Sequence, residues 1–198
     1  MEFKKIQLNG FKSFAEKADF LIEDGLTGIV GPNGCGKSNI VESLRWAMGE
    51  TSAKSMRGSG MEDVIFSGTS NKASKNIAEV TIEVENKDKE GPVQYRDHDQ
   101  IQIKRKIEKD KGSKFYINGK EVRARDAQMF FADLSTGAHS PSMISQGRIG
   151  ALVTAKPTDR RAILEEAAGI SGLHVRRHEA ELRPVSYTHL TLPTICSV

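Results

Sequence analysis

The N-terminal part of the chain contains short apolar runs and then changes to a helical period. Residues 3–8 and 18–22 form two extended runs, and residues 26–30 form a third, which is apolar, β-branched and bounded by glycines. Such a bounded run is typical of a buried strand. Within residues 39–48 apolar side chains recur at helical spacing until Gly49, which predicts a helix. The predicted order is therefore strand, glycine-rich loop, helix.

The middle of the chain has the period-two alternation of strands that are buried on one face. Apolar and polar side chains alternate along residues 77–85, and residues 101–107 repeat this alternation. A third run at 114–117 leads into Asn118-Gly119, a dipeptide that favours a tight hairpin turn. This part of the chain is therefore predicted to be an antiparallel sheet.

Helical patterning returns at 125–134 and 158–168, so the predicted fold class is α/β, with an antiparallel portion added to the core. Residues 51–76 are rich in Ser, Gly, Lys and Asn around one apolar island at 64–66, and we expect a long surface excursion there. Residues 184–198 contain no Asp, Glu, Lys or Arg. We predict that this tail is disordered or foreign to the gene.

Composition excludes several classes of protein. No stretch approaches the ~20 apolar residues of a membrane span, and the N-terminus lacks the apolar region of a secretory signal, so we expect a cytoplasmic protein without membrane contact. Cys35 and Cys196 are too few for a zinc cluster or a disulfide framework. The 29 Lys and Arg against 26 Asp and Glu leave a net charge of +3, which permits nucleic-acid binding without identifying it.

The segment after the third apolar run matches the pattern G-x-x-x-x-G-K-[ST], with a predicted strand before it and a predicted helix after it. Backbone N–H groups in such a loop turn inward around phosphate oxygens, and the helix adds the positive end of its dipole. Lys37 is suited to reach the β- and γ-phosphates, and Ser38 to ligate a bridging Mg²⁺ ion. The predicted nucleotide site comprises Gly31, Pro32, Asn33, Gly34, Cys35, Gly36, Lys37, Ser38 and the adjacent Asn39.

The acidic residues that ATP hydrolysis needs are not evident in the sequence. Asp133 ends an apolar run that superficially resembles the acid-bearing strand of an ATPase, but no second carboxylate follows, and a helical core segment fits better. Residues 134–137 resemble a serine signature only faintly. Gln146 is suited either to present its amide oxygen to Mg²⁺ or water or to lie in a solvated loop. Arg57 either reaches phosphate or faces solvent, and the residues alone favour solvent.

Together these motifs resemble the N-terminal head segment of the SMC (structural maintenance of chromosomes) family, and most of all its bacterial chromosome-partition members. The likeness covers residues 1 to about 183. The family's head is an ABC-type P-loop ATPase, in which this N-terminal lobe folds against a C-terminal segment that carries the Asp-Glu pair and the serine signature. The motifs are the phosphate loop, GFKSF at 10–14, RWAMGE at 45–50, MEDVIF at 61–66, ISQG at 144–147 and EEAAG at 165–169.

The resemblance implies ATP and Mg²⁺ as ligands and gives a role to each matching residue. Lys37 would act catalytically on the phosphates, and Ser38 would ligate the metal. Gln146 would lie at the metal and the attacking water, so the resemblance favours a site residue over a solvated loop amide. Arg57 would reach across the nucleotide as a further catalytic residue.

Weaker correspondences extend the site beyond the phosphate loop. Lys12 and Ser13 would line the phosphate side, and the segment that begins at Asp63 would approach the adenosine. Cys35 stands where the family often has Ser, at a position used for its backbone N–H. Nucleotide binding should therefore survive the cysteine, which adds sensitivity to thiol reagents.

The resemblance also implies boundaries and partners. Residues 1–172 would be the N-terminal half of the head, residues 173–183 the start of a coiled-coil helix, and residues 184–198 the aberrant tail. The implied partners are the C-terminal head segment, a second copy in an SMC homodimer, kleisin-type accessory subunits and DNA, in a nucleoid-associated protein. The basic residues at 104–106, 160–161 and 176–177 either contact DNA phosphates or are solvated surface residues.

Three functional hypotheses follow from the sequence. The first is an SMC head half that binds and, with its C-terminal segment, hydrolyses ATP to drive DNA entrapment, chromosome condensation and segregation. The second is an isolated nucleotide-binding module without turnover, because the acid pair is missing. The third is the head of a related coiled-coil DNA-repair ATPase.

Overall fold

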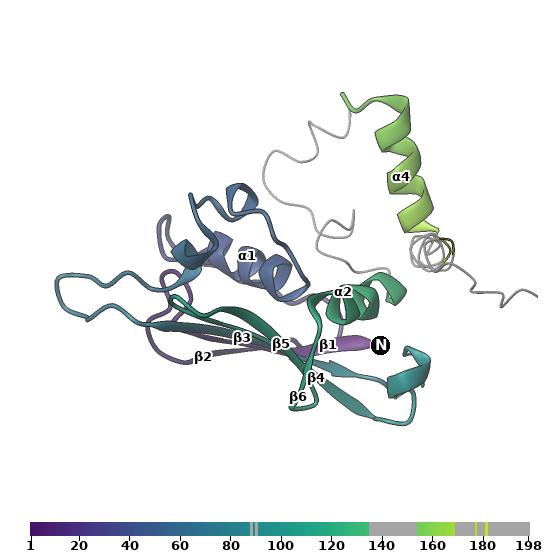
Figure 1. Ribbon diagram of the computed structural model, residues 1–198, viewed down its shortest axis with the longest axis horizontal. Helices are drawn as coiled ribbons and strands as arrows, with labels where there is room; N and C mark the ends of the chain where they lie inside the picture. Colours follow the sequence, from purple (N-terminus) through teal and green to yellow (C-terminus); the bar gives the residue numbers. More distant parts are fainter. Residues whose placement is uncertain (88, 90, 135–153, 169–176, 178–180, 182–198) are drawn as a thin grey trace, which may run out of the picture.

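The computed structural model describes residues 1–87, 89, 91–134, 154–168, 177 and 181. Its strands form one antiparallel sheet of six strands in the order β2-β1-β3-β4-β5-β6 (Figure 1). The strands are β1 (Glu2–Asn9), β2 (Ala18–Leu21), β3 (Ile77–Glu85), β4 (Gln100–Glu108), β5 (Gly112–Ile117) and β6 (Lys120–Val122). The helices are α1 (Lys37–Ala47), α2 (Ala124–Asp133) and α4 (Pro157–Ala167), with short 3₁₀ turns η1 (Lys54–Met56), η2 (Met61–Val64) and η3 (Val93–Tyr95).

The antiparallel sheet predicted for the middle of the chain is confirmed, and its register follows the alternation of apolar residues. Ile82 of β3 pairs with Ile103 of β4, and both side chains are fully buried. β5 and β6 are joined at Asn118 and Gly119, whose φ values of 48° and 79° lie in the left-handed region that a two-residue hairpin turn requires. The predicted helices of residues 39–48, 125–134 and 158–168 correspond to α1, α2 and α4.

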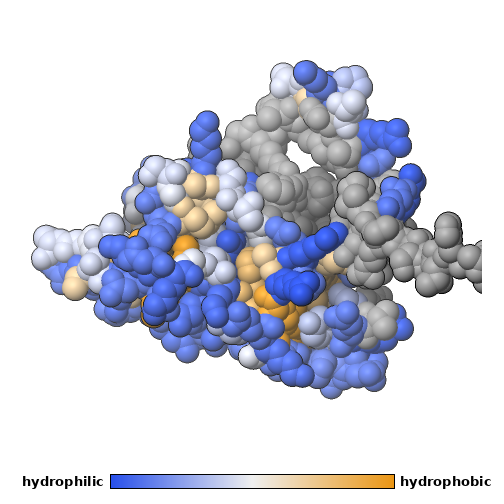
Figure 2. Space-filling model, viewed as in Figure 1, coloured by the Kyte–Doolittle hydropathy of each residue, from blue (hydrophilic) through white to orange (hydrophobic). Residues whose placement is uncertain are grey.

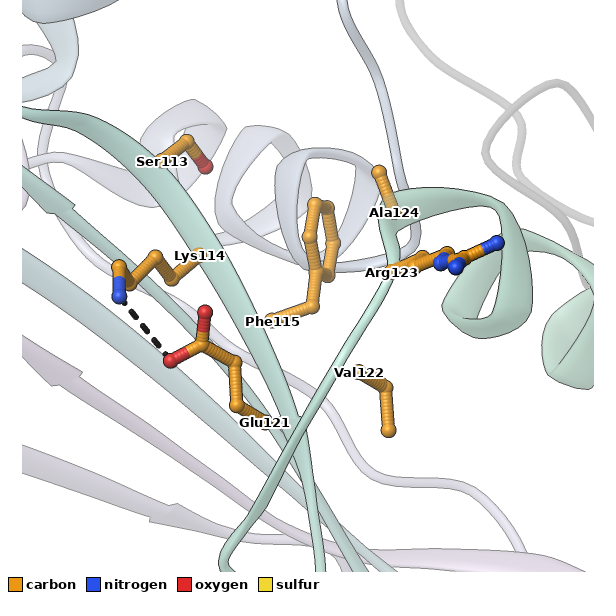
Figure 3. Close-up of a pocket in the computed structure, with 7 residues that line it drawn as sticks. All are labelled: Ser113, Lys114, Phe115, Glu121, Val122, Arg123 and Ala124. Carbon is orange, nitrogen blue, oxygen red and sulfur yellow. Dashed lines mark hydrogen bonds and ion pairs between the residues drawn. The ribbon is translucent and has the colours of Figure 1, made fainter.

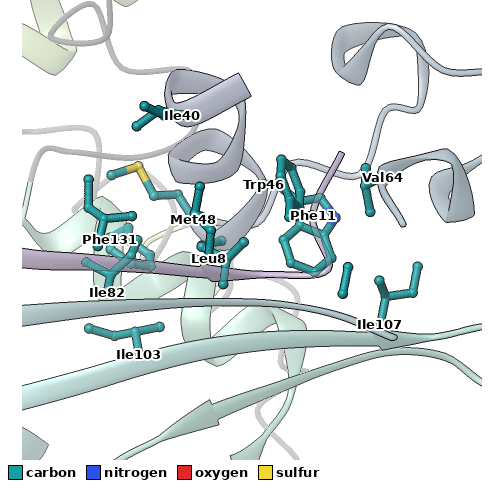
Figure 4. Packing of buried hydrophobic residues seen from close by; sticks show 14 of the residues in the cluster. Leu8, Phe11, Ile40, Trp46, Met48, Val64, Ile82, Ile103, Ile107 and Phe131 are labelled. Carbon is teal, nitrogen blue, oxygen red and sulfur yellow. The ribbon is translucent and has the colours of Figure 1, made fainter. Parts of the chain in front are cut away.

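The core lies between the sheet and the helices α1 and α2, which cover one of its faces (Figures 1 and 4). Trp46 of α1 and Phe131 of α2 are fully buried, and the ring of Phe11 lies 5.4 Å from that of Trp46. At roughly 25 cal/mol per Å² of apolar area, burial of these rings is a main source of the helix-to-sheet attraction. On the face that Figure 2 shows, the described residues are mainly hydrophilic, with an apolar patch near α2.

The structure corrects the prediction of a basic DNA-contacting run at residues 104–106. Arg105 is only 3% exposed, because it occupies an inward position of β4. Its guanidinium lies 4.5 Å from the ring centroid of Trp46 and 4.6 Å from that of Phe115, and burial lowers its pKa to about 10. Only Lys104 and Lys106 remain on the outer face, and Lys104 pairs with Glu79. This run is therefore not a continuous basic surface.

The buried strand predicted for residues 26–30 is wrong. This segment forms no strand, and Leu26 and Val30 are 99% and 93% exposed. A five-residue run has to pair with a neighbouring strand, because its backbone N–H and C=O groups otherwise prefer water. Among the described residues β2 is the edge of the sheet and ends at Leu21, before this run begins. The run thus has the composition of an interior strand and no described partner.

The surface excursion expected at residues 51–76 is confirmed only in part, because its apolar residues pack inward. Met56, Val64 and Phe66 are buried. Backbone hydrogen bonds from Lys12 N to Val64 O (2.7 Å) and from Phe66 N to Gly10 O (2.8 Å) attach the excursion to the turn that follows β1. The excursion is therefore packed against the turn that follows β1 and is only partly a surface loop.

Candidate nucleotide-binding site

The phosphate loop leads directly into α1, as the sequence predicted. Gly34 and Gly36 have φ values of 85° and 97°, which only glycine adopts without strain. Gly36 is the N-cap residue, and no side chain caps the helix. No acidic residue lies in the first turn. The first N–H groups of α1 and its positive dipole end are therefore unopposed by a carboxylate of that turn, which suits an anion.

Lys37 folds back over its own loop. Its ammonium donates hydrogen bonds to Gly31 O and to Pro32 O (2.6 Å), and it lies 3.8 Å from the sulfur of Cys35, which is exposed. Carbonyl oxygens are weak partners for an ammonium compared with a phosphate oxyanion, which forms a charge-assisted hydrogen bond. Lys37 is thus centred on the loop and can exchange these carbonyls for phosphate. Ser38, the next residue, is exposed in the first turn of α1.

The turn at residues 10–14 closes one side of the loop. A Cβ atom at Gly36 would lie 2.6 Å from the hydroxyl oxygen of Ser13, so the loop and the turn are in close contact. The amide nitrogen of Asn39 donates to the same Ser13 oxygen over 2.8 Å. Lys12 lies one residue earlier in this turn. The structure therefore brings Ser13 and Asn39 together with the phosphate loop, whereas the ammonium of Lys12 pairs with Glu42.

Glu42 joins these residues to Arg57, and sequence reasoning missed it. Glu42 is on α1, is 8% exposed, and forms ion pairs with both Lys12 and Arg57. Arg57 also donates from Nη2 to Asn39 Oδ1 over 3.2 Å. The sequence held one signal for this cluster: Glu42 is a charged residue between Ile40 and Trp46, on a helix whose other inward residues are mostly apolar. Arg57, whose side chain is 60% exposed, faces both solvent and this cluster.

Asp63 is engaged locally. One carboxylate oxygen accepts hydrogen bonds from Ser59 N (2.6 Å), Ser59 Oγ (2.8 Å) and Gly60 N (2.9 Å), and these bonds lower the pKa of Asp63. This carboxylate caps η2, so an adenosine contact at Asp63 stays a prediction.

Gln146, the ISQG motif and the tail lie outside the described residues, as does most of the segment 173–183.

The described residues hold no cluster of three His, Cys, Asp or Glu side chains able to bind a metal by itself. Asp133 ends α2, whose Phe130 and Phe131 are buried, in agreement with the helical interpretation.

A hollow of about 460 Å³ lies between β5, β6 and the start of α2 and contains none of the predicted site residues (Figure 3). An ion pair of 3.0 Å between Lys114 and Glu121 lies along it. The candidate nucleotide site is thus the loop with its surrounding polar cluster.

A glycine-rich loop at the N-terminus of a helix, packed on an antiparallel sheet, defines the chain as a P-loop nucleotide-binding lobe. The sequence profile described as "RecF/RecN/SMC N terminal domain" matches residues 2–148. The chain therefore belongs to the family of RecF/RecN/SMC N-terminal domains, and the resemblance drawn from its motifs is confirmed.

Curated relatives agree with this assignment. The chain is 56% identical over 192 residues to the chromosome partition protein Smc of Rhodopseudomonas palustris and 58% identical over 183 residues to that of Cereibacter sphaeroides. These matches cover 96% and 92% of this chain but only 17% and 16% of the two relatives. The chain thus spans about a sixth of the length of these proteins.

Solved structures confirm the predicted fold class of an α/β ABC-type head lobe. An Smc head domain with an extended coiled coil from Pyrococcus furiosus, bound to the C-terminal domain of ScpA, is similar with a TM-score of 0.78 and 30% identity over 90% of this chain and 44% of that chain. A structure described under "ATP-driven dimerization and DNA stimulated activation of SMC ATPases" has a TM-score of 0.72 and 32% identity, and covers 84% of this chain and 99% of that chain.

Proposed function

We propose that this chain is the ATP-binding N-terminal segment of a chromosome-partition SMC head. The observation that carries the proposal is the phosphate loop at the start of α1, with Lys37 centred on it and with Ser13 and Asn39 packed against it. In this role the backbone N–H groups of the loop bind the phosphates, and Lys37 neutralises their charge. Ser38 and Gln146 would hold a Mg²⁺ ion, which would neutralise charge on the phosphates when bound.

Turnover requires the C-terminal head segment of the same protein. Two features of the described residues support this part of the proposal: they hold no acidic cluster for the metal, and the run at residues 26–30 is exposed although it has the composition of a buried strand. A partner that supplies both an acid pair and a strand beside this run would complete the head. We propose in addition that the N-terminal half of the head ends at residue 172 and that the start of the coiled coil ends at residue 183.

The partners of the whole protein follow from its relatives. Dimerisation of two heads and binding of a kleisin-type subunit are proposed, because neighbouring structures are described by ATP-driven dimerization and by a bound ScpA domain. DNA is proposed as the substrate of the assembled protein, in a nucleoid-associated location. Arg105 does not contribute to DNA binding, since it is buried. No helix among the described residues is long and apolar enough to cross a membrane.

The proposal is tested by measuring ATP binding and ATP turnover with this chain alone and mixed with the C-terminal head segment encoded by the same gene. Binding by the chain alone, turnover only in the mixture, and loss of both in Lys37→Ala are expected. Turnover by the chain alone would contradict the split of the site and would return attention to Asp133. Binding without turnover in the mixture would favour the second candidate, a nucleotide-binding module without catalysis, which the absence of an acidic cluster from the described residues also supports.

A further inference from the structure

A single carboxylate organises the polar cluster beside the phosphate loop. Glu42 lies on the inward side of α1, where Ile40, Trp46 and Ala47 are buried apolar residues. A carboxylate that leaves water at such a position is costly unless it is paired and hydrogen-bonded. Glu42 meets this requirement with two cations, Lys12 on one oxygen and Arg57 on the other.

The backbone is strained at both of these cations. Lys12 and Arg57 have φ values of 47° and 54°, in the left-handed region that residues with a Cβ atom rarely occupy. Strain of this kind persists only where the surroundings over-determine it, and it concentrates at functional sites. The ammonium of Lys12 also donates to the carbonyl of Met56, the residue before Arg57, so the two strained turns are tied to each other as well as to Glu42.

The contacts of Arg57 use only part of its guanidinium. Nη2 carries both the ion pair with Glu42 and the 3.2 Å hydrogen bond to Asn39 Oδ1. The Asn39 amide is itself fixed, because its nitrogen donates to Ser13. The donors on Nη1 and Nε take no part in these two contacts, and the side chain is 60% exposed. Because Nη2 makes both contacts, the Nη1 and Nε donors of Arg57 can form hydrogen bonds to an anion.

The charges of the cluster favour an anion too. Two cations share one carboxylate, so the group of three keeps one net positive charge, next to the loop that Lys37 occupies. Without a fixed partner a long exposed side chain samples many rotamers and loses conformational entropy when it is immobilised. Glu42 supplies that partner, and the group of three still carries one net positive charge.

We propose that Glu42 is a positioning residue for nucleotide binding: it holds the Arg57 guanidinium beside the phosphate loop, while Lys12 neutralises the remaining charge of the carboxylate. The role rests on the proposed function, since it requires a nucleotide at the loop. It assigns to Glu42 an effect that passes through Arg57 rather than a contact with the nucleotide.

A double-mutant cycle on ATP affinity tests this role. The full chain is titrated with ATP as wild type, Glu42→Gln, Arg57→Gln and the double variant. Glutamine at 42 keeps the size of the side chain and removes its charge. A charge-assisted hydrogen bond contributes ~1.5–3 kcal/mol, so Arg57→Gln should weaken ATP binding about tenfold in the wild-type background. In the Glu42→Gln background the same substitution should cost less than about twofold, because Arg57 is no longer held.

Controls separate this inference from the proposed function. Glu79→Gln removes a partly buried carboxylate from an ion pair with Lys104 on the other face of the sheet and should leave ATP affinity unchanged. Lys37→Ala should abolish binding. If Lys37→Ala abolishes binding but Arg57→Gln costs the same factor with and without the Glu42 charge, the positioning role is wrong and the proposed function stands. If wild type and Lys37→Ala bind ATP equally, or neither binds, both are overturned.

Circular dichroism shows whether Glu42→Gln folds. If it does not, Glu42→Asp replaces it in the cycle, because aspartate keeps the buried charge but is one methylene too short to hold both Lys12 and Arg57. The prediction is then the same: the cost of Arg57→Gln must shrink in the Glu42→Asp background, and an unchanged cost overturns the role.

Discussion

The guanidinium of Arg105 lies against the indole of Trp46 and donates from Nη1 to the backbone oxygens of Trp46 (2.6 Å) and Glu50 (2.7 Å). These contacts tie the C-terminal end of α1 to β4. At the other end of the helix, Asn39 is tied to Ser13 over 2.8 Å. The helix that carries the phosphate loop is therefore fixed to the sheet and to the turn after β1, so the loop sits on a rigid support.

Arg105→Met should destabilise the chain by about 3 kcal/mol, since it leaves the two buried carbonyl oxygens and Ser113 without their donor. Lysine should not restore the stability, because one ammonium cannot reproduce the fork of the guanidinium. Urea unfolding measures the difference. Lys106→Met, on the outer face of the same strand, is the matched control and should change the free energy of unfolding by less than about 0.5 kcal/mol. Equal losses in both variants would contradict the anchoring role of Arg105.

Gly36→Ala should be more harmful than Gly34→Ala. Both glycines have a left-handed backbone, with φ values of 97° and 85°, so an added Cβ strains each by ~1 kcal/mol or more. A Cβ at Gly36 would also lie 2.6 Å from Ser13 Oγ, whereas nothing lies within 4 Å of one at Gly34. Thermal unfolding should therefore show that Gly34→Ala is more stable than Gly36→Ala. ATP titration of the two variants should show the same ranking for nucleotide affinity. The reverse ranking would show that the turn and the loop are not in contact.

The cap of η2 should make part of the stability depend on pH. Hydrogen bonds from Gly60 N and Ser59 lower the pKa of Asp63 from its usual 3.8, so the folded state favours the ionised carboxylate. The stabilisation is complete above the pKa of the unfolded state and is lost as pH falls through the lowered pKa of the folded state. Asp63→Asn should thus be less stable than wild type at pH 7, and the gap should close in strongly acidic urea titrations. A gap that widens on acidification would refute this account.

Strand periodicity was the most informative part of the sequence. The alternation at 77–85 predicts β3 with its observed bounds, because a half-buried strand has to place every second side chain in the core. The glycine-rich loop was equally clear, since few sequences satisfy both its glycines and its lysine. The prediction for residues 26–30 is wrong for the converse reason: composition reports what a segment can bury, and no described strand lies beside this one.

Ion pairs between distant residues could not be found in the same way. Glu42 contacts Lys12 and Arg57, which are separated from it by 30 and 15 positions in the sequence. Arg105 looked like surface charge beside Lys104 and Lys106, although the period-two pattern already placed it on the apolar face. A single sequence shows the charge of a residue, whereas its partner depends on how the turns after β1 and in the excursion come together.

The exposed run at residues 26–30 gives the sharpest test of the missing half of the head. Leu26 is 99% exposed, so Leu26→Lys should leave the stability of the chain within about 0.5 kcal/mol of wild type. If the C-terminal head segment covers this run, the same charge has to be desolvated on association, which weakens the complex by at least ~2 kcal/mol or roughly thirtyfold. Sedimentation or calorimetric titration of the two segments measures the affinity, and turnover in the mixture should fall with it.

The matched control is Leu21→Lys, at the end of the edge strand β2, where the leucine is 64% exposed. A charge there should leave the affinity for the C-terminal segment nearly unchanged, because Leu21 already lies in a paired strand of this chain. Equal weakening by both lysines would mean that the partner covers the β2 edge as well as the run before the phosphate loop. No weakening by Leu26→Lys would mean that residues 26–30 stay exposed in the assembled head, and the run would then have to be explained without a partner strand.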